Sequence, residues 1–198
     1  MMKNLEDSEL VLMFKEGDNK AFEEIVLRYQ AQLYTYIISL VKDPEAANDI
    51  LQDVFIRIFR KLRNYSEENK LKHWLFIIAK NLTMDFFRRN KTRRALPLES
   101  REEDEMSILD TVSDKAPQPL EVIITNDRKE MLRKAISDLS IEERELIYLK
   151  DSLTFKEISE MQNKPIGTLL SKFNRSLKKL RKIISEKEPE VYNEECVR

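Results

Sequence analysis

The sequence predicts an all-α protein in which two small helical domains are joined by an acidic linker. Glycine occurs at only two of the 198 positions, Gly17 and Gly167, whereas globular proteins average about 7%. Leu, Ile, Glu, Lys and Arg are abundant, and these residues are found mostly in helices. Apolar residues recur three and four positions apart in several segments, which is the spacing of a buried helix face. The scarcity of glycine also excludes a glycine-rich phosphate-binding loop.

The first residues predict a short helix followed by a long one. Asp7 and Ser8 can cap the short helix, and Gly17 stands where it would end. Apolar residues from 22 to 40 then continue at helical spacing.

Two further helices complete the N-terminal half. Asp43 and Pro44 suit the N-cap and the first position of a helix over residues 44–63. Another apolar stripe predicts a helix over about 70–90. We expect these helices to share one core, so that residues 1–94 form an N-terminal domain.

Helical periodicity is lost after this domain and then returns. Residues 95–118 contain seven acidic and two basic residues and two prolines, with a third proline at position 119, which predicts an acidic linker. Farther on, two capping boxes, Ser140 with Glu143 and Thr154 with Glu157, predict the starts of two helices.

The C-terminal half ends in a helix-turn-helix pattern. The second capping box opens a very short helix, and Pro165 fits the first position of a final helix. Asn163 lies in the turn between them, where its side chain tolerates a left-handed backbone. We assign residues 119–185 to a C-terminal domain and residues 186–198 to an acidic tail.

Charge is segregated along the chain, although the formal net charge is only −1. Residues 57–94 contain twelve Lys or Arg and three acids, and residues 161–185 contain seven basic residues and no acid. Two basic segments joined by an acidic one indicate two surfaces for a polyanion. The alternative is that both segments are solvated helix faces.

The residue inventory argues against several other classes of protein. One His and one Cys exclude a zinc finger, which needs about four such ligands. We expect no catalytic residue, cofactor or metal, although a site made only of carboxylates stays open. Cys196 has no partner for an internal disulfide. No apolar run approaches the roughly 20 residues that span a bilayer, and the first residues lack an apolar signal core. We therefore expect a cytoplasmic protein without membrane insertion.

One face of the 44–63 helix suits a protein partner. Opposite the apolar stripe lie Asp49, Gln52 and Ile56, with Asp53 on the flank. An outward apolar residue among acids can anchor a basic partner. Alternatively, Ile56 is an ordinary isolated exposed residue.

The 70–91 helix carries a second stripe that suits single-stranded nucleic acid. Lys80, Asn81, Met84 and Arg88 line it, with Phe76 and Phe87 beyond. Cations meet the phosphates, rings stack on bases, and an amide bonds a base edge. The alternative for the two Phe rings is a second core surface.

Three more residues on this helix receive structural assignments. We expect His73 to lie on the solvated surface and Trp74 to pack in the core. Asp85 should pair with an arginine such as Arg89.

The outer face of the last helix suits duplex DNA. It carries Thr168, Ser171, Lys172, Arg175 and Lys179. A helix in the major groove presents base-reading groups in its first turns and phosphate contacts around them. The alternative is a plain helical hairpin with a soluble outer face.

Three stretches together resemble extracytoplasmic-function (ECF) sigma factors, small promoter-specificity subunits of bacterial RNA polymerase. They are DPEAANDILQDVF at 43–55, WLFIIAKN at 74–81 with Asp85, Arg88 and Arg89, and the segment 139–172. The first resembles the helix that binds core polymerase and the second the segment that opens and reads the −10 element. The third resembles the helix-turn-helix that reads the −35 element.

The resemblance implies a role for each face. Asp49, Gln52, Asp53 and Ile56, the polymerase set, would dock on the polymerase clamp helices. Asn81 would line a pocket for a base flipped from the non-template strand. The complete −10 set is Tyr65, Lys80, Asn81, Met84, Arg88 and Arg89. The −35 set is Thr168, Ser171, Lys172, Arg175 and Lys179.

The resemblance also implies partners and exposes one departure. Its partners would be RNA polymerase core (clamp helices and flap), promoter DNA and an anti-sigma factor, with no covalent chemistry catalysed by the chain. Leu170 stands where family members often have Arg or Lys. The resemblance therefore does not predict which DNA sequence is read at the −35 element. A DNA-binding regulator with a helical sensor domain and a helical adaptor remain as alternative functions.

The linker is long enough for a reader of two sites. Two DNA sites two helical turns apart lie roughly 70 Å apart. Residues 95–118 extend to roughly 80 Å at about 3.3 Å per residue.

Overall fold

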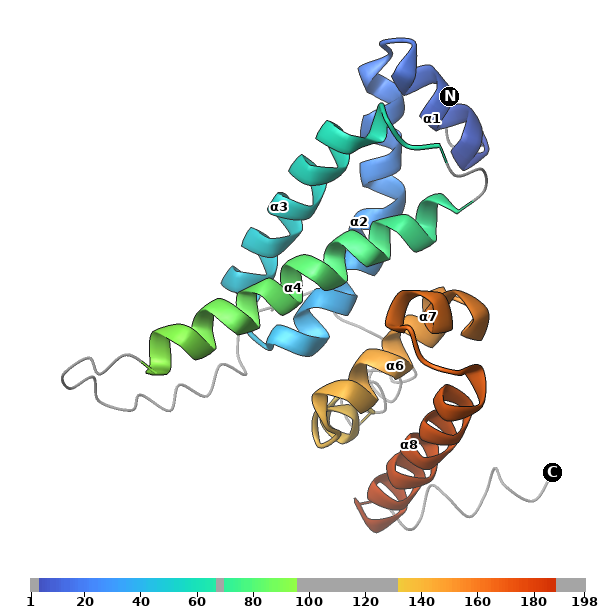
Figure 1. Ribbon diagram of the computed structural model, residues 1–198. Helices are drawn as coiled ribbons and strands as arrows, with labels where there is room; N and C mark the ends of the chain where they lie inside the picture. The colour runs from blue at the N-terminus through green and yellow to red at the C-terminus, as the bar shows by residue number, and fades with distance from the viewer. Residues whose placement is uncertain (1–3, 67–69, 96–131, 188–198) are drawn as a thin grey trace, which may run out of the picture.

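The computed structural model describes residues 4–66, 70–95 and 132–187, and all regular structure in these ranges is helical (Figure 1). The predicted all-α class is therefore confirmed. The predicted linker, residues 119–131 of the predicted C-terminal domain and the acidic tail beyond residue 187 lie outside the described residues.

Four helices form the N-terminal half. They are α1 (Asp7–Lys15), α2 (Asn19–Val41), α3 (Pro44–Leu62) and α4 (Leu71–Ala95). The Asp43 carboxylate accepts hydrogen bonds from the amides of Glu45 and Ala46 at 3.0 and 3.2 Å, and Pro44 is the first helical residue. This satisfies amides that have no partner within the helix, and α3 therefore begins where the sequence predicts.

The first helix has a different cap from the predicted one. Its N-cap is Glu6, whose amide donates to the Glu9 carboxylate at 2.7 Å. Asp7 serves tertiary packing instead, because its carboxylate binds the Arg28 guanidinium at 2.6 Å and accepts from the Tyr29 hydroxyl. Burial, and then the hydrogen bond to Asp7, raise the pKa of Tyr29.

The core of this half lies between α2, α3 and α4, and α1 packs across its end. Fully buried residues include Leu33, Ile37, Ile58, Leu62 and Leu75. Phe14 of α1 closes the end of the core. Its ring centroid lies 5.6 Å from that of Phe22 and 5.3 Å from that of Phe59. Phe59 belongs to the predicted apolar stripe, yet 43% of its surface is exposed.

The C-terminal half contains helical residues 132–137, α6 (Ile141–Ser152), α7 (Phe155–Gln162) and α8 (Ile166–Lys187). Both predicted capping boxes are present, at Ser140 with Glu143 and at Thr154 with Glu157. Asn163 adopts the left-handed conformation, with φ of 51°, and ends α7. A short helix, a tight turn and a long helix thus form the expected helix-turn-helix.

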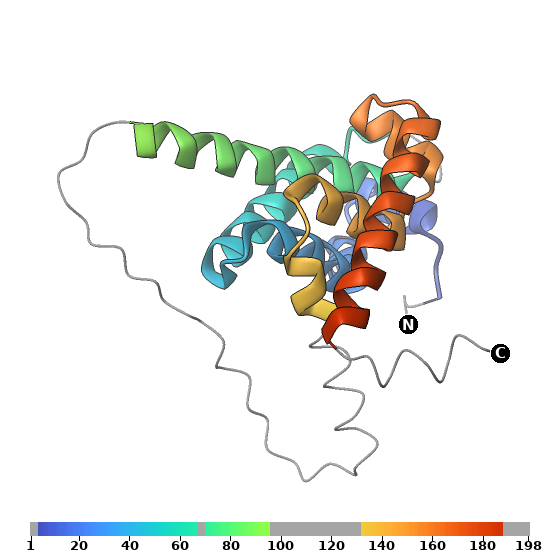
Figure 2. The ribbon, with the colours of Figure 1, turned by 90° about the horizontal axis from the view of Figure 1, so that it is seen from below.

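The two halves pack against each other, which the sequence analysis did not predict. Helix α6 lies on α2, and α7 lies beside the first half of α4, as Figures 1 and 2 show. Leu146, Leu149 and Ile158 of the C-terminal half belong to the same buried cluster as the N-terminal core. Helix α8, which follows α7 after a tight turn, therefore begins close to α4.

We expect Phe14→Ala to lower the free energy of unfolding by about 3–5 kcal/mol, because it removes a fully buried ring. Leu12→Ala on the same helix is the matched control. Leu12 is 58% exposed, so its truncation should change stability by less than about 0.5 kcal/mol. Urea denaturation followed by circular dichroism measures both variants. Equal losses would show that α1 is not stabilised through Phe14.

Candidate nucleic-acid interface

The outward face of α3 is exposed as the sequence predicts. Asp49, Gln52 and Asp53 are exposed, and 49% of the Ile56 surface is accessible. Asp49 and Asp53 line one side of a groove of about 250 Å³, whose other side is the C-terminal part of α4. Arg89 of the −10 set lines this acidic groove as well, so it lies beside the polymerase set.

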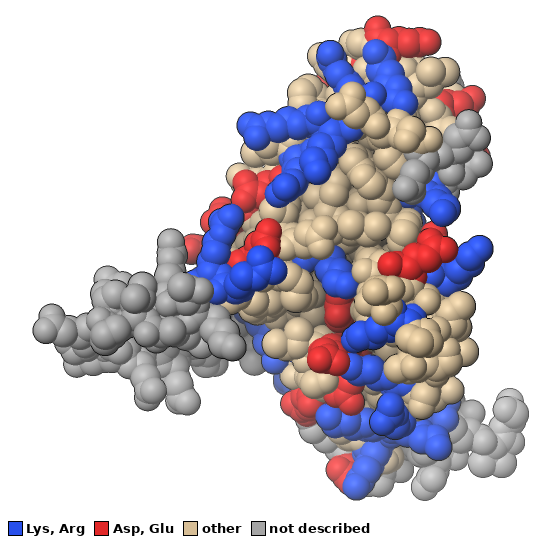
Figure 3. Space-filling model, viewed as in Figure 1, with Lys and Arg blue, Asp and Glu red and all other residues tan. Residues whose placement is uncertain are grey.

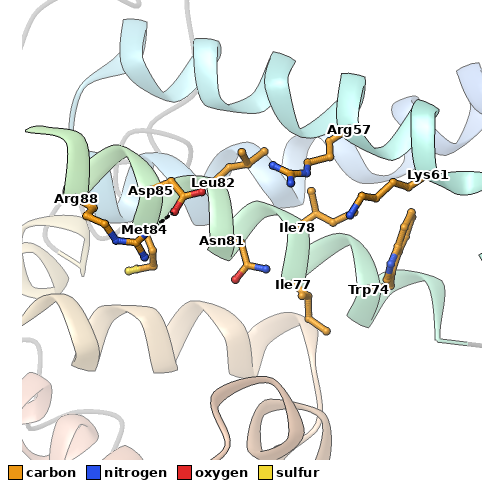
Figure 4. Close-up of a pocket in the computed structure, with 10 residues that line it drawn as sticks. All are labelled: Arg57, Lys61, Trp74, Ile77, Ile78, Asn81, Leu82, Met84, Asp85 and Arg88. Carbon is orange, nitrogen blue, oxygen red and sulfur yellow. Dashed lines mark hydrogen bonds and ion pairs between the residues drawn. The ribbon is translucent and has the colours of Figure 1, made fainter.

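A second groove, of about 380 Å³, separates α3 from the middle of α4 (Figure 4). Three members of the −10 set, Asn81, Met84 and Arg88, line it. Arg57 and Lys61 reach over it from α3. We call this hollow the α3–α4 groove.

Arg57 and Lys61 were not among the predicted site residues. Both belong to the basic segment 57–94, and their i,i+4 spacing places them on one face of α3. The spacing alone does not show that this face looks onto Asn81, because that depends on the crossing of α3 and α4.

The groove combines three kinds of chemistry in one place. Its cations, Arg57, Lys61 and Arg88, can meet phosphate charge, although Arg88 also binds Asp85 at 2.9 Å. Trp74 offers a ring edge and Asn81 an exposed amide. This combination is typical of surfaces that bind single-stranded nucleic acid.

Three members of the −10 set lie outside this groove, and one of them is Arg89, which lines the acidic groove instead. Tyr65 is buried, and its ring centroid lies 4.9 Å from the Trp74 ring. Lys80 points to the C-terminal half, where its ammonium lies 3.9 Å from the Glu145 carboxylate and donates to the Met161 carbonyl at 3.3 Å.

The structure bears on three other expectations on α4, of which the one for His73 is wrong. His73 is not a solvated residue: only 5% of it is exposed, and its Nε2 lies 3.1 Å from the Glu157 carbonyl oxygen. Asp85 pairs with an arginine, as expected, but the partner is Arg88 at i,i+3, at 2.9 Å. Phe76 is fully buried against Tyr36, so its ring fills a second core surface.

Two expectations on α4 are supported. Trp74 packs against Tyr65 and the hydrophobic cluster, as predicted. Phe87 is half-buried and contacts Phe86, which agrees with the alternative that its ring packs against the protein.

The face of α8 divides into exposed and paired residues. Thr168, Ser171 and Arg175 of the −35 set are exposed. Lys172 forms an ion pair with Glu142 of α6, and the Lys179 ammonium donates to Glu143 at 3.3 Å.

The acids of α6 therefore balance part of the basic run in α8. The hydrogen bond from Lys172 is the main cause of the lowered pKa of Glu142. Residues 161–185 themselves contain no acid. The carboxylates that balance them belong to α6 and lie 30 or more positions earlier in the chain than their partners. Lys and Arg side chains still gather over α3 and over α8 in Figure 3.

Other kinds of site have no support among the described residues. In that part of the chain, no three His, Cys, Asp or Glu side chains gather as a metal site would require. None of the described helices has the length and apolarity needed to cross a bilayer.

Comparison with known proteins shows which family the chain is similar to. Residues 25–93, which include the α3–α4 groove, match the family described as Sigma-70 region 2. The chain is 29% identical over 170 residues to the ECF RNA polymerase sigma factor SigW of Bacillus subtilis, covering 85% of this chain and 91% of that protein. Over most of its length, this chain is similar to ECF RNA polymerase sigma factors. Members of that family are not enzymes.

Further comparisons support both the sigma factor family and its fold. The chain is 25% identical over 182 residues to the ECF sigma-E factor of Escherichia coli K12, covering 89% and 93% of the two chains. The sigma factor RpoE of Bartonella quintana, solved with the anti-sigma factor NepR, superposes with a TM-score of 0.62. The two chains are 22% identical, and the superposition covers 84% of this chain and 98% of the RpoE chain.

We expect Arg57→Ala to weaken binding of an AT-rich single-stranded oligonucleotide to the polymerase-bound sigma factor about fivefold. The lost cation should also reduce the salt slope of log K by about 0.7. Arg60→Ala is the matched control, since Arg60 is exposed on the same helix and does not line the groove. Fluorescence anisotropy at several salt concentrations measures both variants. Equal losses would remove Arg57 from the interface.

Proposed function

We propose that this chain is an ECF sigma factor, which binds core RNA polymerase, recognises −10 and −35 promoter elements and promotes strand opening. The α3–α4 groove carries this proposal, because it joins cations, a ring and an exposed amide within the region 2 match. The chain itself catalyses no covalent chemistry. Its action on promoter DNA and polymerase takes place in the cytoplasm.

Strand opening follows from differential binding. Duplex DNA keeps its bases stacked, so they cannot contact Asn81 or Trp74 in the groove. A separated strand gains these contacts while its phosphates stay close to Arg57, Lys61 and Arg88. Binding of the open form therefore shifts the DNA equilibrium toward separated strands.

Duplex recognition at the −35 element is assigned to α8. Thr168 and Ser171, exposed near the start of the helix, suit phosphate or base contacts, and Arg175 suits a guanine edge. Leu170 is exposed on the same part of the helix. Lys172 and Lys179 act once DNA phosphates replace Glu142 and Glu143 as their partners.

Polymerase docking is assigned to the polymerase set on α3. Its exposed carboxylates suit the basic surface of the clamp helices, and Ile56 supplies an apolar contact. The C-terminal domain would contact the flap. We propose that an anti-sigma factor controls the protein by covering these surfaces.

In vitro transcription with purified core polymerase, followed by mapping of start sites, tests the whole proposal. We expect specific starts that depend on this protein. If the mapped starts are the same without it, the proposed function is wrong.

We expect Asn81→Ala to reduce strand opening at a mapped promoter about tenfold while core binding stays unchanged, because the amide contacts only the extruded base. Permanganate footprinting measures opening, and native gel electrophoresis measures core binding. Gln30→Ala, an exposed amide on α2, serves as the control. Wild-type opening by Asn81→Ala would remove this residue from the −10 set.

We expect Asp49→Arg to have the opposite profile. Reversing this exposed charge should weaken core binding at least tenfold, since it sets like charges together across a docking surface. Glu23→Arg makes the same charge change on the exposed surface of α2 and should retain wild-type affinity. Fluorescence titration with labelled core polymerase distinguishes the two. Unchanged affinity of Asp49→Arg would place the docking surface elsewhere.

A further inference from the structure

Helix α8 presents its polar side chains in two rows. Lys172 and Lys179 are seven residues apart, about two helical turns, so they lie above one another. Ser171, Arg175 and Lys178 follow one another at spacings of four and three residues, and all three are exposed. We call Lys172 and Lys179 the inner row and the other three residues the outer row.

Each lysine of the inner row has a carboxylate partner in the first turn of α6. Lys172 forms a hydrogen-bonded ion pair with Glu142, and the Lys179 ammonium donates to the Glu143 carboxylate at 3.3 Å. The partners are separated by 30 and 36 positions in the chain. Folding of the C-terminal half therefore creates both pairs.

The outer row differs, because its cations have no acidic partner within the described part of the chain. Arg175 donates its Nε to the Ser171 carbonyl of its own helix at 3.4 Å. Lys178 is exposed, and the ion pairs that α8 forms with described residues use other lysines. The outer row thus presents uncompensated positive charge, whereas the charge of the inner row is balanced.

The two glutamates hold the inner row as DNA phosphates would. A hydrogen bond from an ammonium to an anionic oxygen is the contact that lysine makes with either group. The pKa of Glu142 is lowered, first by the hydrogen bond from Lys172 and then by the charges of Lys172 and Lys164. The pKa of Glu143 is lowered as well, mainly by its hydrogen bond with the Ser140 amide. Both carboxylates therefore stay ionised at neutral pH.

DNA can reach the inner row only by displacing these carboxylates. Surface ion pairs contribute little to stability, so displacement is possible. The displaced carboxylate then stays beside the phosphates and repels them. Glu143 in particular cannot turn away, because the oxygen that binds Lys179 also accepts from the Ser140 amide at 2.8 Å and caps α6.

We propose that Glu142 and Glu143 determine the DNA affinity of α8, because they compete with phosphates for Lys172 and Lys179 and keep duplex binding weak. This inference rests on the proposed function of α8 and adds two residues that oppose binding. A weak reader binds firmly only when another contact holds it near the DNA, since tethering raises its effective concentration. Helix α8 would then contribute at promoters, where polymerase and the −10 element supply that contact, and would release other duplex DNA.

Two conservative variants test this competition in the full chain. Glu142→Gln and Glu143→Gln remove each charge with little change of size, and glutamine can still complete the capping box. Asp151→Asn is the matched control, because it removes one exposed charge from the other end of α6. Circular dichroism confirms that each variant is folded.

The first measurement is affinity for duplex DNA without polymerase, by fluorescence anisotropy. One labelled duplex comes from upstream of a mapped start and a second has the same bases in scrambled order. On both we expect Glu142→Gln to bind about fivefold, Glu143→Gln about threefold and the double variant about tenfold more tightly than the wild type. Asp151→Asn should match the wild type. Unchanged affinity of the folded double variant, or an equal gain in Asp151→Asn, overturns the inference.

The second measurement is the salt dependence of the same binding. Each removed carboxylate leaves one lysine free to neutralise a phosphate, so the slope of log K against log salt should steepen by about 0.9 per variant. The control should keep the wild-type slope. A wild-type slope in the double variant would show that the inner row gains no phosphate contact, which contradicts competition.

A double-mutant cycle tests whether Glu142 acts through Lys172. Lys172→Gln removes the ammonium that Glu142 holds. In that background Glu142→Gln should leave affinity almost unchanged, because no lysine remains to be released. A full fivefold gain in the Lys172→Gln background would mean that Glu142 acts through its charge alone, and the inference would be wrong.

The scrambled duplex separates this inference from the proposed function. Competition for phosphates does not depend on base sequence, so the gain on this duplex decides the inference even if no transcription start requires the protein. In that case the proposed function fails alone. If the double variant binds neither duplex at low salt, α8 is not a DNA-binding surface and the inference is overturned.

Discussion

Helix α4 has to satisfy two buried surfaces at once, and this constraint shapes the rest of the molecule. Leu75 and Ala79 pack into the core with α2 and α3, while His73 and Phe76 face α7 and Tyr36. A helix has only about 3.6 residues per turn, so two buried faces leave one narrow open strip. That strip forms the floor of the α3–α4 groove, and the proposed strand-opening chemistry is therefore confined to it.

Ion pairs between helices are a second constraint, because they determine which basic side chains are available to nucleic acid. The protein has almost equal numbers of acidic and basic residues, and folding brings several of them together across the fold. Lys172 and Lys179 of α8 meet carboxylates of α6, and Lys80 meets Glu145. The pairs of Lys172 and Lys179 lie at the surface and contribute little to stability, so their ammonium groups can change partners when DNA phosphates approach. Pairing in the free protein is therefore compatible with nucleic-acid binding.

The arrangement of the two halves links these limits to regulation. A sigma factor with free domains would offer every surface to polymerase and DNA at all times. Here the surface that buries Phe76 and holds Lys80 also receives α6 and α7. Within the described residues, Nε and Nη1 of Arg144 are buried without a hydrogen-bond partner at that contact, and Glu145 is buried as well, which lowers the stability of the contact. A partner that binds the separated halves better can therefore shift the population.

Capping and periodicity are local properties, so the helices and most of their ends could be predicted from the sequence, with the start of α1 as an exception. Asp43, Ser140 and Thr154 cap the helices that follow them, and the outward position of Ile56 follows from helical spacing alone. Partners separated by many residues required the tertiary structure. His73 was placed in solvent because its cover, α7, lies 84 positions away at Glu157. The same holds for Arg57 and Lys61, whose role depends on how α3 crosses α4, and for Glu145, which meets Tyr36 across 109 positions. Periodicity shows which face of each helix is buried, but it does not show which element covers that face. Docking of one half on the other depends on which surfaces fit together.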